Sequence, residues 1–397
     1  MIAEFIGHGI HEDDNETCGN YVCSSLKNSV FTDITVFVAF IRKPGILELK
    51  PFIQQAISEK RNVTFFVGRN KTMTELTGIF KLIEEHTFTA DKCFLCGCSL
   101  TNDNKTEEHV IPKWLQHQFN LWDEKISLLN GTLLPYRLLT IPCCFECNNH
   151  HLRPFEDKIK AAVDSGYEEF QKVDKELLFL WLGKIYFGIM YRELFLNLDR
   201  TDPEKGTITN PEYLKSFYSH FLFLQGIRKL HTFNDFFPAS IYLFKTQKPN
   251  NIKKQWDFID SQNTPFVSIR MGEIGIISVL QDCEATYQLK ELLDHHRDID
   301  LHPLQFREMT AKILYKRFLM NRTPKFMNVQ NGGSTETHLM SLQGLSDKPI
   351  FDDWNNDDYS LLLSDITGVP LEICQPEKGK VWTWMMDIDG NSTFIPV

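Results

Sequence analysis

Four cysteines in two Cys-x-x-Cys pairs are the residues whose spacing most clearly predicts chemistry in this chain. Cys93 and Cys96 form the first pair, and Cys144 and Cys147 form the second. Zinc prefers a tetrahedral set of thiolates, and one Cys-x-x-Cys turn lets two sulfurs converge on the same ion. The spacing therefore predicts a structural Zn²⁺ bound by four thiolates, with buried unligated cysteines as the alternative.

A histidine lies between the two cysteine pairs in the run Glu108-His109-Val110-Ile111-Pro112. A neutral imidazole can take a proton from water, and a nearby carboxylate can hold a hard cation against a phosphate. A single His beside a carboxylate is more often an ordinary surface or core residue. Adjacent residues of a strand also point to opposite faces, so Glu108 and His109 need a bend or bulge to converge.

Asn148 follows the last cysteine directly, at the expected start of a helix. Its amide oxygen could bind a hard cation. Asn is equally common as a helix N-cap, and the spacing alone leaves both roles open.

Taken together, Glu108-His109-x-x-Pro112 and Cys144-x-x-Cys147-Asn148 resemble the HNH endonuclease family, which has the ββα-metal fold. The resemblance implies that His109 is the general base that activates water. It also implies that Glu108 and Asn148 bind a catalytic Mg²⁺ or Mn²⁺, with His151 as a further ligand.

The chain departs from the family pattern at two positions. Glu108 stands where the family usually has Asp, and Leu139 stands where the family has an Asn that orients the general base. Asn130 or a backbone carbonyl could take over this orienting role. The missing Asn favours the alternative of a non-catalytic zinc-finger module that binds nucleic acid or another protein.

Composition limits where nucleic acid could bind. The 397-residue chain has a net charge of −10, which excludes a generally basic coat, so any nucleic-acid surface must be local. Lys113 lies beside the histidine motif. Residues 307–325 are rich in Lys and Arg, so a basic face on the helix expected at 303–321 is feasible. Such a face is usually only solvated. The candidate phosphate contacts are Lys113, Lys312, Lys316 and Arg317.

The sequence also favours a reducing compartment. Ten cysteines in a chain of this length do not form a disulfide scaffold, and the first residues lack the pattern of a signal peptide. The most apolar run, residues 177–191, contains Lys184 and is too short to span a bilayer. We expect a cytoplasmic protein with no membrane partner.

The pattern of elements predicts an α+β protein with three regions. Residues 1–90 are expected to form a small α/β accessory lobe, residues 91–160 a central zinc-stapled ββα-metal module, and residues 161–397 a mostly helical region with a small sheet.

In the accessory lobe, strands at 34–41 and 63–68 flank a helix at 46–58, and a second helix is predicted at 73–85. This order predicts a parallel crossover. The stretch resembles the opening of phospholipase D-like nuclease domains. It lacks their His-x-Lys motif, so the resemblance implies a degenerate half-domain, and an accessory lobe without chemistry is the alternative.

In the C-terminal region the pattern predicts a core helix at 175–196 and a hairpin at 266–280. The polar stretch 328–348, with Gly332-Gly333, is predicted to be a long loop. Further helices are expected at 211–232, 284–296 and 303–321, and strands near 381–386.

The HNH resemblance implies hydrolysis of phosphodiester bonds in nucleic acid, with DNA favoured over RNA. It also implies a role in prokaryotic defence against foreign nucleic acid. Residues 161–397 would then select the substrate, a protein partner or a second copy of the chain. A third hypothesis is an effector whose C-terminal half senses a ligand.

Overall fold

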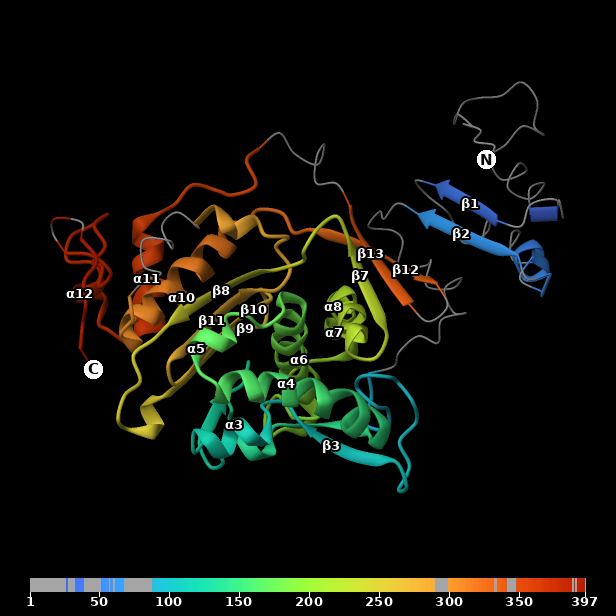
Figure 1. Cartoon of the computed structure of the whole chain (residues 1–397), viewed down its shortest axis with the longest axis horizontal. Helices are drawn as coiled ribbons and strands as arrows, with labels where there is room; N and C mark the ends of the chain where they lie inside the picture. Colours follow the sequence, from blue (N-terminus) through green and yellow to red (C-terminus); the bar gives the residue numbers. More distant parts are fainter. Residues whose placement is uncertain are drawn as a thin grey trace. The chain divides into compact units, whose positions relative to one another are not determined.

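The structure, a computed structural model, divides the chain into two compact units, Met1–His86 and Thr87–Val397 (Figure 1). The first boundary expected from the sequence, near residue 90, lies close to this division. The described residues are 26–27, 33–38, 51–56, 58–59, 61–67, 88–289, 299–331, 334–340, 348–387, 389 and 391–396.

The first unit contains a two-stranded parallel sheet. β1 (Asp33–Val38) pairs with β2 (Asn62–Val67) in a register that runs from Asp33 opposite Asn62 to Val38 opposite Val67. Residues 51–56, between the two strands, are helical. The predicted parallel strand pair is therefore confirmed. The helix predicted at 73–85 lies outside the described residues, and the phospholipase D-like resemblance stays a prediction.

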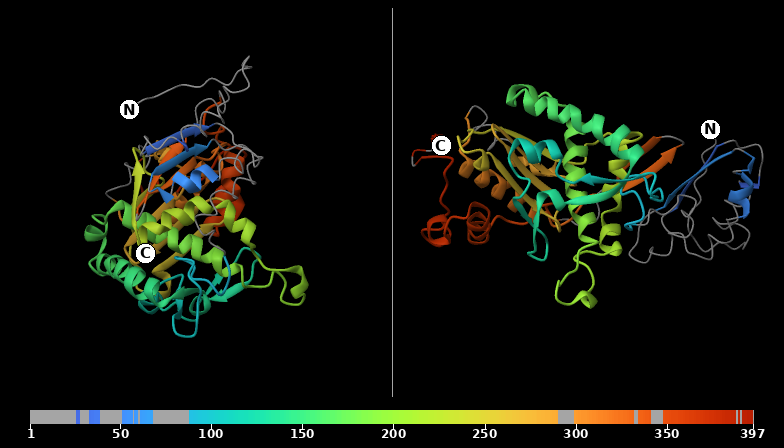
Figure 2. Two further views of the ribbon diagram at one scale, coloured as in Figure 1. Left: turned by 90° about the vertical axis from the view of Figure 1, so that its right-hand side faces the viewer. Right: turned by 90° about the horizontal axis from the view of Figure 1, so that it is seen from below.

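The second unit is a mixed α+β structure built in layers, as expected for the fold class. A four-stranded antiparallel sheet in the order β8-β11-β10-β9 lies between helix α6 on one face and helix α10 on the other (Figures 1 and 2). These elements are α6 (Lys175–Glu193), β8 (Ser240–Lys245), β9 (Trp256–Ser261), β10 (Phe266–Met271), β11 (Ile274–Val279) and α10 (Pro303–Phe318).

Strand β10 shows why the sequences of the strands in this sheet are apolar along most of their length. Alternate side chains point to opposite faces of a strand. Val267 and Ile269 pack in the core that contains α6, whereas Phe266 packs in the core that contains α10. Ser268 also faces α10, where its hydroxyl lies 2.8 Å from the Thr310 hydroxyl. All six residues of β10 are therefore buried, and the predicted β10–β11 hairpin is confirmed.

Helix α6 is the central core element, and almost every residue from Leu178 to Tyr191 is buried. Asp174 caps its start by accepting hydrogen bonds from the backbone N–H groups of Glu176 and Leu177. Gly188 allows close packing, because a Cβ at this position would lie 3.0 Å from both Val110 methyl groups. No helix in the described part of the chain is long and apolar enough to cross a membrane.

The residues of the candidate site lie on a two-stranded sheet and the helix that follows it. β3 (Lys105–His109) pairs antiparallel with β6 (Thr140–Cys144), and a π-helical turn, η4 (Cys147–Leu152), leads into α4 (Arg153–Asp164). The segment between the two strands forms α3 (Lys113–Gln118), β4 (Lys125–Ser127), β5 (Leu133–Pro135) and the short turn η3 (Tyr136–Leu138).

The C-terminal region contains more sheet than the sequence predicted. The expected loop at 328–348 is wrong, because β12 (Lys325–Asn331) and β13 (Ser334–Met340) form an antiparallel pair. β7 (Leu230–Asn234) adds to β13 in parallel. On β13 the inward residues Thr335 and Thr337 are buried but polar, so the strand carries no apolar alternation that could reveal it.

Helix α10 confirms the helix predicted at 303–321. The helix predicted at 284–296 begins with a 3-10 turn at Ala285–Leu289, and the rest of it lies outside the described residues. The helix predicted at 211–232 is divided into α7 (Pro211–Ser216) and α8 (Tyr218–Leu224). The strands predicted near 381–386 are not present among the described residues. Residues 381–386 come after two helices, α11 (Asn356–Thr367) and α12 (Leu371–Cys374).

Candidate metal centre and active site

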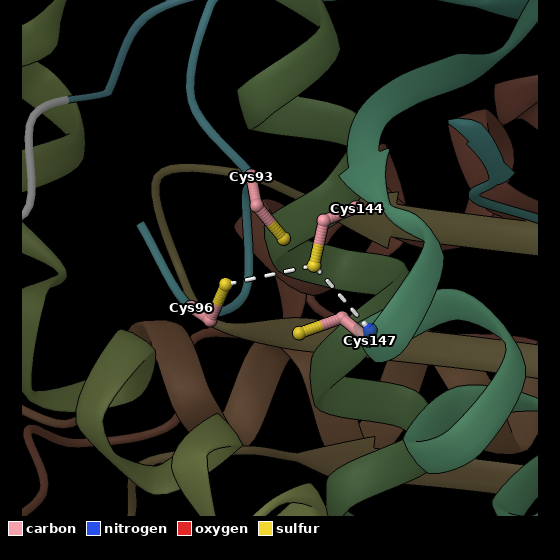
Figure 3. A group of neighbouring side chains, drawn as sticks. All are labelled: Cys93, Cys96, Cys144 and Cys147. Carbon is pink, nitrogen blue, oxygen red and sulfur yellow. Dashed lines mark hydrogen bonds between the residues drawn. The ribbon is translucent and has the colours of Figure 1, made fainter. Parts of the chain in front are cut away.

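The four predicted zinc ligands come together. One ligand atom from each of Cys93, Cys96, Cys144 and Cys147 lies within 4.8 Å of all the others, and Figure 3 shows the sulfurs pointing toward one another. Among the described residues, no other group of three or more His, Cys, Asp and Glu side chains could hold a metal ion. The two cysteine pairs therefore form one site, as their spacing predicts.

Backbone geometry supports both cysteine turns. The Gly97 N–H donates to the Cys93 carbonyl, and Gly97 adopts a φ of 75°, which few other residues tolerate. The Cys147 N–H points at the Cys144 sulfur across 3.4 Å. The Phe94 N–H donates to the Pro142 carbonyl over 2.9 Å, so the first turn is bound to strand β6.

The donor set fits zinc. Four sulfurs at about 2.3 Å from a tetrahedral Zn²⁺ lie about 3.8 Å from one another. The Cys96 and Cys144 sulfurs are 3.7 Å apart. All four donors are thiols, which suit zinc far better than a hard cation such as Mg²⁺. The cluster can therefore hold a structural zinc ion.

A fifth cysteine, Cys143, supports the cluster without belonging to it. Its sulfur lies 3.9 Å from the Cys93 sulfur. This hydrogen bond lowers the pKa of Cys93 and raises the pKa of Cys143, so Cys143 keeps its proton and donates it toward the Cys93 thiolate. Such contacts around a metal ligand fix its orientation.

Strand β3 places its charged residues on two different faces. The β3–β6 register is unbroken from Lys105 to His109, so neither a bend nor a bulge brings neighbouring side chains together. Glu108 is buried and faces the core, whereas Glu107 is exposed and His109 is half-buried. By strand alternation Glu107 and His109 share the outer face.

His109 has the properties of a neutral base. Burial lowers its pKa to about 4, and the positive charges of Lys113 and Lys184 act in the same direction, while Glu107 partly opposes them. The imidazole is therefore uncharged near neutral pH. Its ring nitrogens make no hydrogen bond with any residue that the structure describes, which leaves both able to meet a ligand.

An aromatic stack holds the His109 ring. Trp122 lies between two histidines, with its ring centroid 6.2 Å from that of His109 and 5.0 Å from that of His117. The interplanar angles are 22° and 14°, within the range of offset stacking. Contact with Trp122 can therefore orient the imidazole without occupying its nitrogens.

On the inner face of β3, Glu108 belongs to a buried ion cluster. The Lys184 ammonium is fully buried and donates to Glu108, to Glu156 at 2.8 Å, and to the His109 and Val110 carbonyls at 2.7 and 3.3 Å. Burial lowers the pKa of Lys184, but the two carboxylates outweigh this effect and raise it. Burial raises the pKa of Glu156 to about 7, although Lys184 opposes that shift.

This cluster does not fit the predicted role of Glu108 as a ligand of a catalytic cation. The Glu108 carboxylate is already neutralised by Lys184, whose positive charge would repel a second cation at the same oxygens. Withdrawing Glu108 would also leave an ammonium in the core with one carboxylate fewer, at a cost of several kcal/mol. A cation bound at Glu108 is therefore not part of the reaction that we propose.

The other predicted ligands are placed as follows. The Asn148 side chain donates to the Thr106 hydroxyl at 3.0 Å and to the Glu107 carbonyl at 3.4 Å, so it binds strand β3 rather than capping the helix. Its amide oxygen accepts no hydrogen bond from any residue that the structure describes. His151 lies beside Glu146, with 4.0 Å between Nε2 and Oε1. Their roles as cation ligands stay predictions.

Asn130, the side chain proposed to orient His109 in place of the family's Asn, makes no hydrogen bond with it. Leu139 is fully buried and contributes its carbonyl to the Val110 N–H. Asn130 uses its amide to bind the Leu198 carbonyl and the Thr132 N–H. The backbone carbonyl of His109 is instead bound by Lys184, and its ring by Trp122.

The predicted phosphate contacts differ in exposure. Lys113 is exposed at the start of α3, and its charge acts on His109. On α10, Lys312 pairs with Glu308, Lys316 lies over the Phe351 ring, and Arg317 is buried. These three α10 side chains therefore make ionic or packing contacts within the protein. This is evidence against a basic face on the helix.

Three residues that contribute to the site were not predicted: Trp122, Glu156 and Lys184. The signal available for Lys184 was a charged residue inside an apolar run, which in a buried helix calls for an ionic partner. Trp122 and Glu156 carried no such signal.

No protein-family model, curated protein or solved structure matches the chain.

Substitution of a zinc ligand tests the metal centre. We expect Cys147→Ser to lose bound zinc and to lower the unfolding temperature, because three thiolates hold the ion far less tightly than four. Metal content by mass spectrometry and thermal unfolding would check this. Cys283→Ser is the matched control, since Cys283 is a free cysteine outside the cluster, and it should keep its zinc. Full zinc retention in Cys147→Ser would contradict the assignment.

The buried ion cluster predicts a pH-dependent loss of stability. Lys184→Met should lower the free energy of unfolding by about 3–5 kcal/mol, because it leaves carboxylates in the core without their counter-charge. Burial raises the pKa of Glu156, so the folded state favours the protonated form of its carboxyl group.

The loss should therefore be smaller at about pH 5, where Glu156 takes a proton, than at about pH 8, where it is ionised. Urea denaturation at both pH values measures the difference. A loss that does not change with pH would show that Lys184 contributes only packing.

Removal of Trp122 should release the His109 ring. In Trp122→Leu, the His109 and His117 ring protons should move away from their ring-current-shifted positions, as seen by NMR of histidine-labelled protein. Trp354→Leu serves as the control, because Trp354 packs on Tyr315 and Tyr359 and contacts no described histidine. Unchanged histidine spectra in Trp122→Leu would rule out the stack.

Proposed function

We propose that the chain is a nuclease of the HNH type, which hydrolyses phosphodiester bonds in nucleic acid, with DNA favoured over RNA. One observation carries the proposal. His109 presents a neutral imidazole, whose nitrogens bind no described residue, on the outer face of β3, and the partner strand β6 ends at Cys144 of the four-cysteine site.

Three further features support this function. The order of two antiparallel strands followed by a helix, β3, β6 and then η4 with α4, is the arrangement that the HNH resemblance implies. Lys113 is exposed next to His109, where a phosphate would meet a positive charge. Trp122 holds the ring in the absence of the family's Asn.

In the proposed reaction His109 removes a proton from water, and the resulting hydroxide attacks phosphorus. The bond from phosphorus to the 3′ oxygen breaks, and this leaving oxygen takes a proton from solvent. The base must be uncharged before it can accept the proton of the attacking water, and burial together with Lys113 maintains that state. Lys113 is placed to attract the phosphate. An HNH cation, when bound, would stabilise charge on the phosphate.

A non-catalytic zinc module that binds nucleic acid or a protein is the second candidate. Two observations favour it: Leu139 occupies the orienting position, and Lys184 occupies the Glu108 carboxylate. Both hypotheses share the zinc site and the exposed Lys113, so binding alone does not separate them. Only the nuclease requires His109 for turnover.

Nicking of plasmid DNA in Mg²⁺ or Mn²⁺ tests the proposal, with RNA as a second substrate. We expect His109→Ala to lower the rate by about 100-fold or more, the usual contribution of a general base, while zinc content and unfolding temperature stay unchanged. His150→Ala is the control, since His150 is exposed beside Glu146. If the wild-type protein binds nucleic acid but cuts neither DNA nor RNA with either metal, the binding module is the better description.

A further inference from the structure

We infer that Glu107, rather than Glu108, is the carboxylate that works with His109, and that it binds the hard divalent cation of this face. The inference rests on the proposed nuclease function and relocates its cation by one residue. The two glutamates are neighbours on β3, but the strand turns them to opposite sides.

The inner side of β3 has no room for a second cation. The Lys184 ammonium already has four oxygen neighbours, from Glu108, Glu156 and the backbone of His109 and Val110. This is the kind of oxygen set that a hard cation prefers, and the chain fills it with its own charge. A divalent ion at Glu108 would have to expel a fully buried ammonium.

The outer side offers an exposed carboxylate. Glu107 makes no ion pair within 4.0 Å in the described part of the chain, although the positive charge of Arg192 interacts with it. One of its oxygens accepts a hydrogen bond from the Thr140 hydroxyl, and the other has no described partner. Thr140 lies directly opposite His109 in the strand register, so the hydroxyl, the carboxylate and the imidazole occupy one face.

Chemistry also favours this face. A general base and the cation that neutralises the phosphate must act on the same phosphorus, so they have to lie on the same side of the strand. Glu107 and His109 meet this requirement without any distortion of β3. The negative charge of Glu107 already acts on the His109 ring. Thr140 limits the rotation of the carboxylate and leaves one oxygen for a ligand.

The test compares two isosteric substitutions, Glu107→Gln and Glu108→Gln, with Mn²⁺ as the probe. Mn²⁺ affinity is measured by calorimetry, and its position by paramagnetic broadening of the His109 ring signals. Glu107→Gln should weaken Mn²⁺ binding by at least about tenfold, the scale on which even outer-shell changes act. It should also remove the broadening at His109 and abolish nicking, with unfolding temperature unchanged.

Glu108→Gln should do the opposite. It removes a partner of Lys184 and should lower the unfolding temperature, while Mn²⁺ still broadens His109. Glu336→Gln is the matched control for loss of an exposed strand carboxylate, since Glu336 lies two residues before His338 on β13, 3.4 Å from its ring. It should change neither Mn²⁺ binding nor nicking.

The outcomes separate this inference from the proposed function. Mn²⁺ binding that depends on Glu107 in a protein that never cuts nucleic acid would support the cation site and overturn the nuclease. Cutting that depends on His109 but not on Glu107 would support the nuclease and overturn the cation site. Absence of Mn²⁺ binding, or binding lost in Glu108→Gln and kept in Glu107→Gln, would also overturn it.

Discussion

The buried ammonium of Lys184 is the constraint on which the arrangement of the candidate site depends. A lysine enters a protein core only when its charge is compensated. Here the compensation comes from Glu108 on β3 and Glu156 on α4, so one side chain of α6 joins three elements. Because Glu108 must face this ammonium, strand alternation turns Glu107 and His109 outward. The orientation of the face that carries Glu107 and His109 thus follows from the ion cluster beneath it.

The four-cysteine site and the ion cluster act on opposite ends of the same strand pair. Cys144 lies opposite Lys105, at the start of β3, and its sulfur belongs to the metal group. At the other end of β3, Lys184 binds the carbonyl of His109. Thiolates can fix the ends of loops that are distant in sequence, but they do not determine which way a strand faces. The two interactions are therefore complementary, and removing either one would leave His109 less well positioned.

Local patterns predicted the parts of this arrangement that depend on nearby residues. The Cys-x-x-Cys spacing predicted the site formed by Cys93, Cys96, Cys144 and Cys147, because each turn places its own two sulfurs close together. The alternation of side chains along a strand predicted that Glu108 and His109 would point to different faces. The ion cluster escaped prediction because Lys184 is separated from Glu108 by 76 positions, and a lysine in an apolar helix reads equally well as one that reaches toward solvent. Strand β13 escaped prediction because its buried residues Thr335 and Thr337 are polar.

The state of the His109 ring distinguishes the two functions better than the cysteine site does. The His109 nitrogens make no hydrogen bond with any described residue, and neither is among the buried polar atoms that lack a partner, so water can reach them. A general base needs this condition, because its nitrogen must be neutral and open to water before the reaction begins. The stack with Trp122 contacts the ring without occupying either nitrogen. A neutral imidazole that water can reach suits the proposed general base, whereas a module that only binds nucleic acid has no need of it.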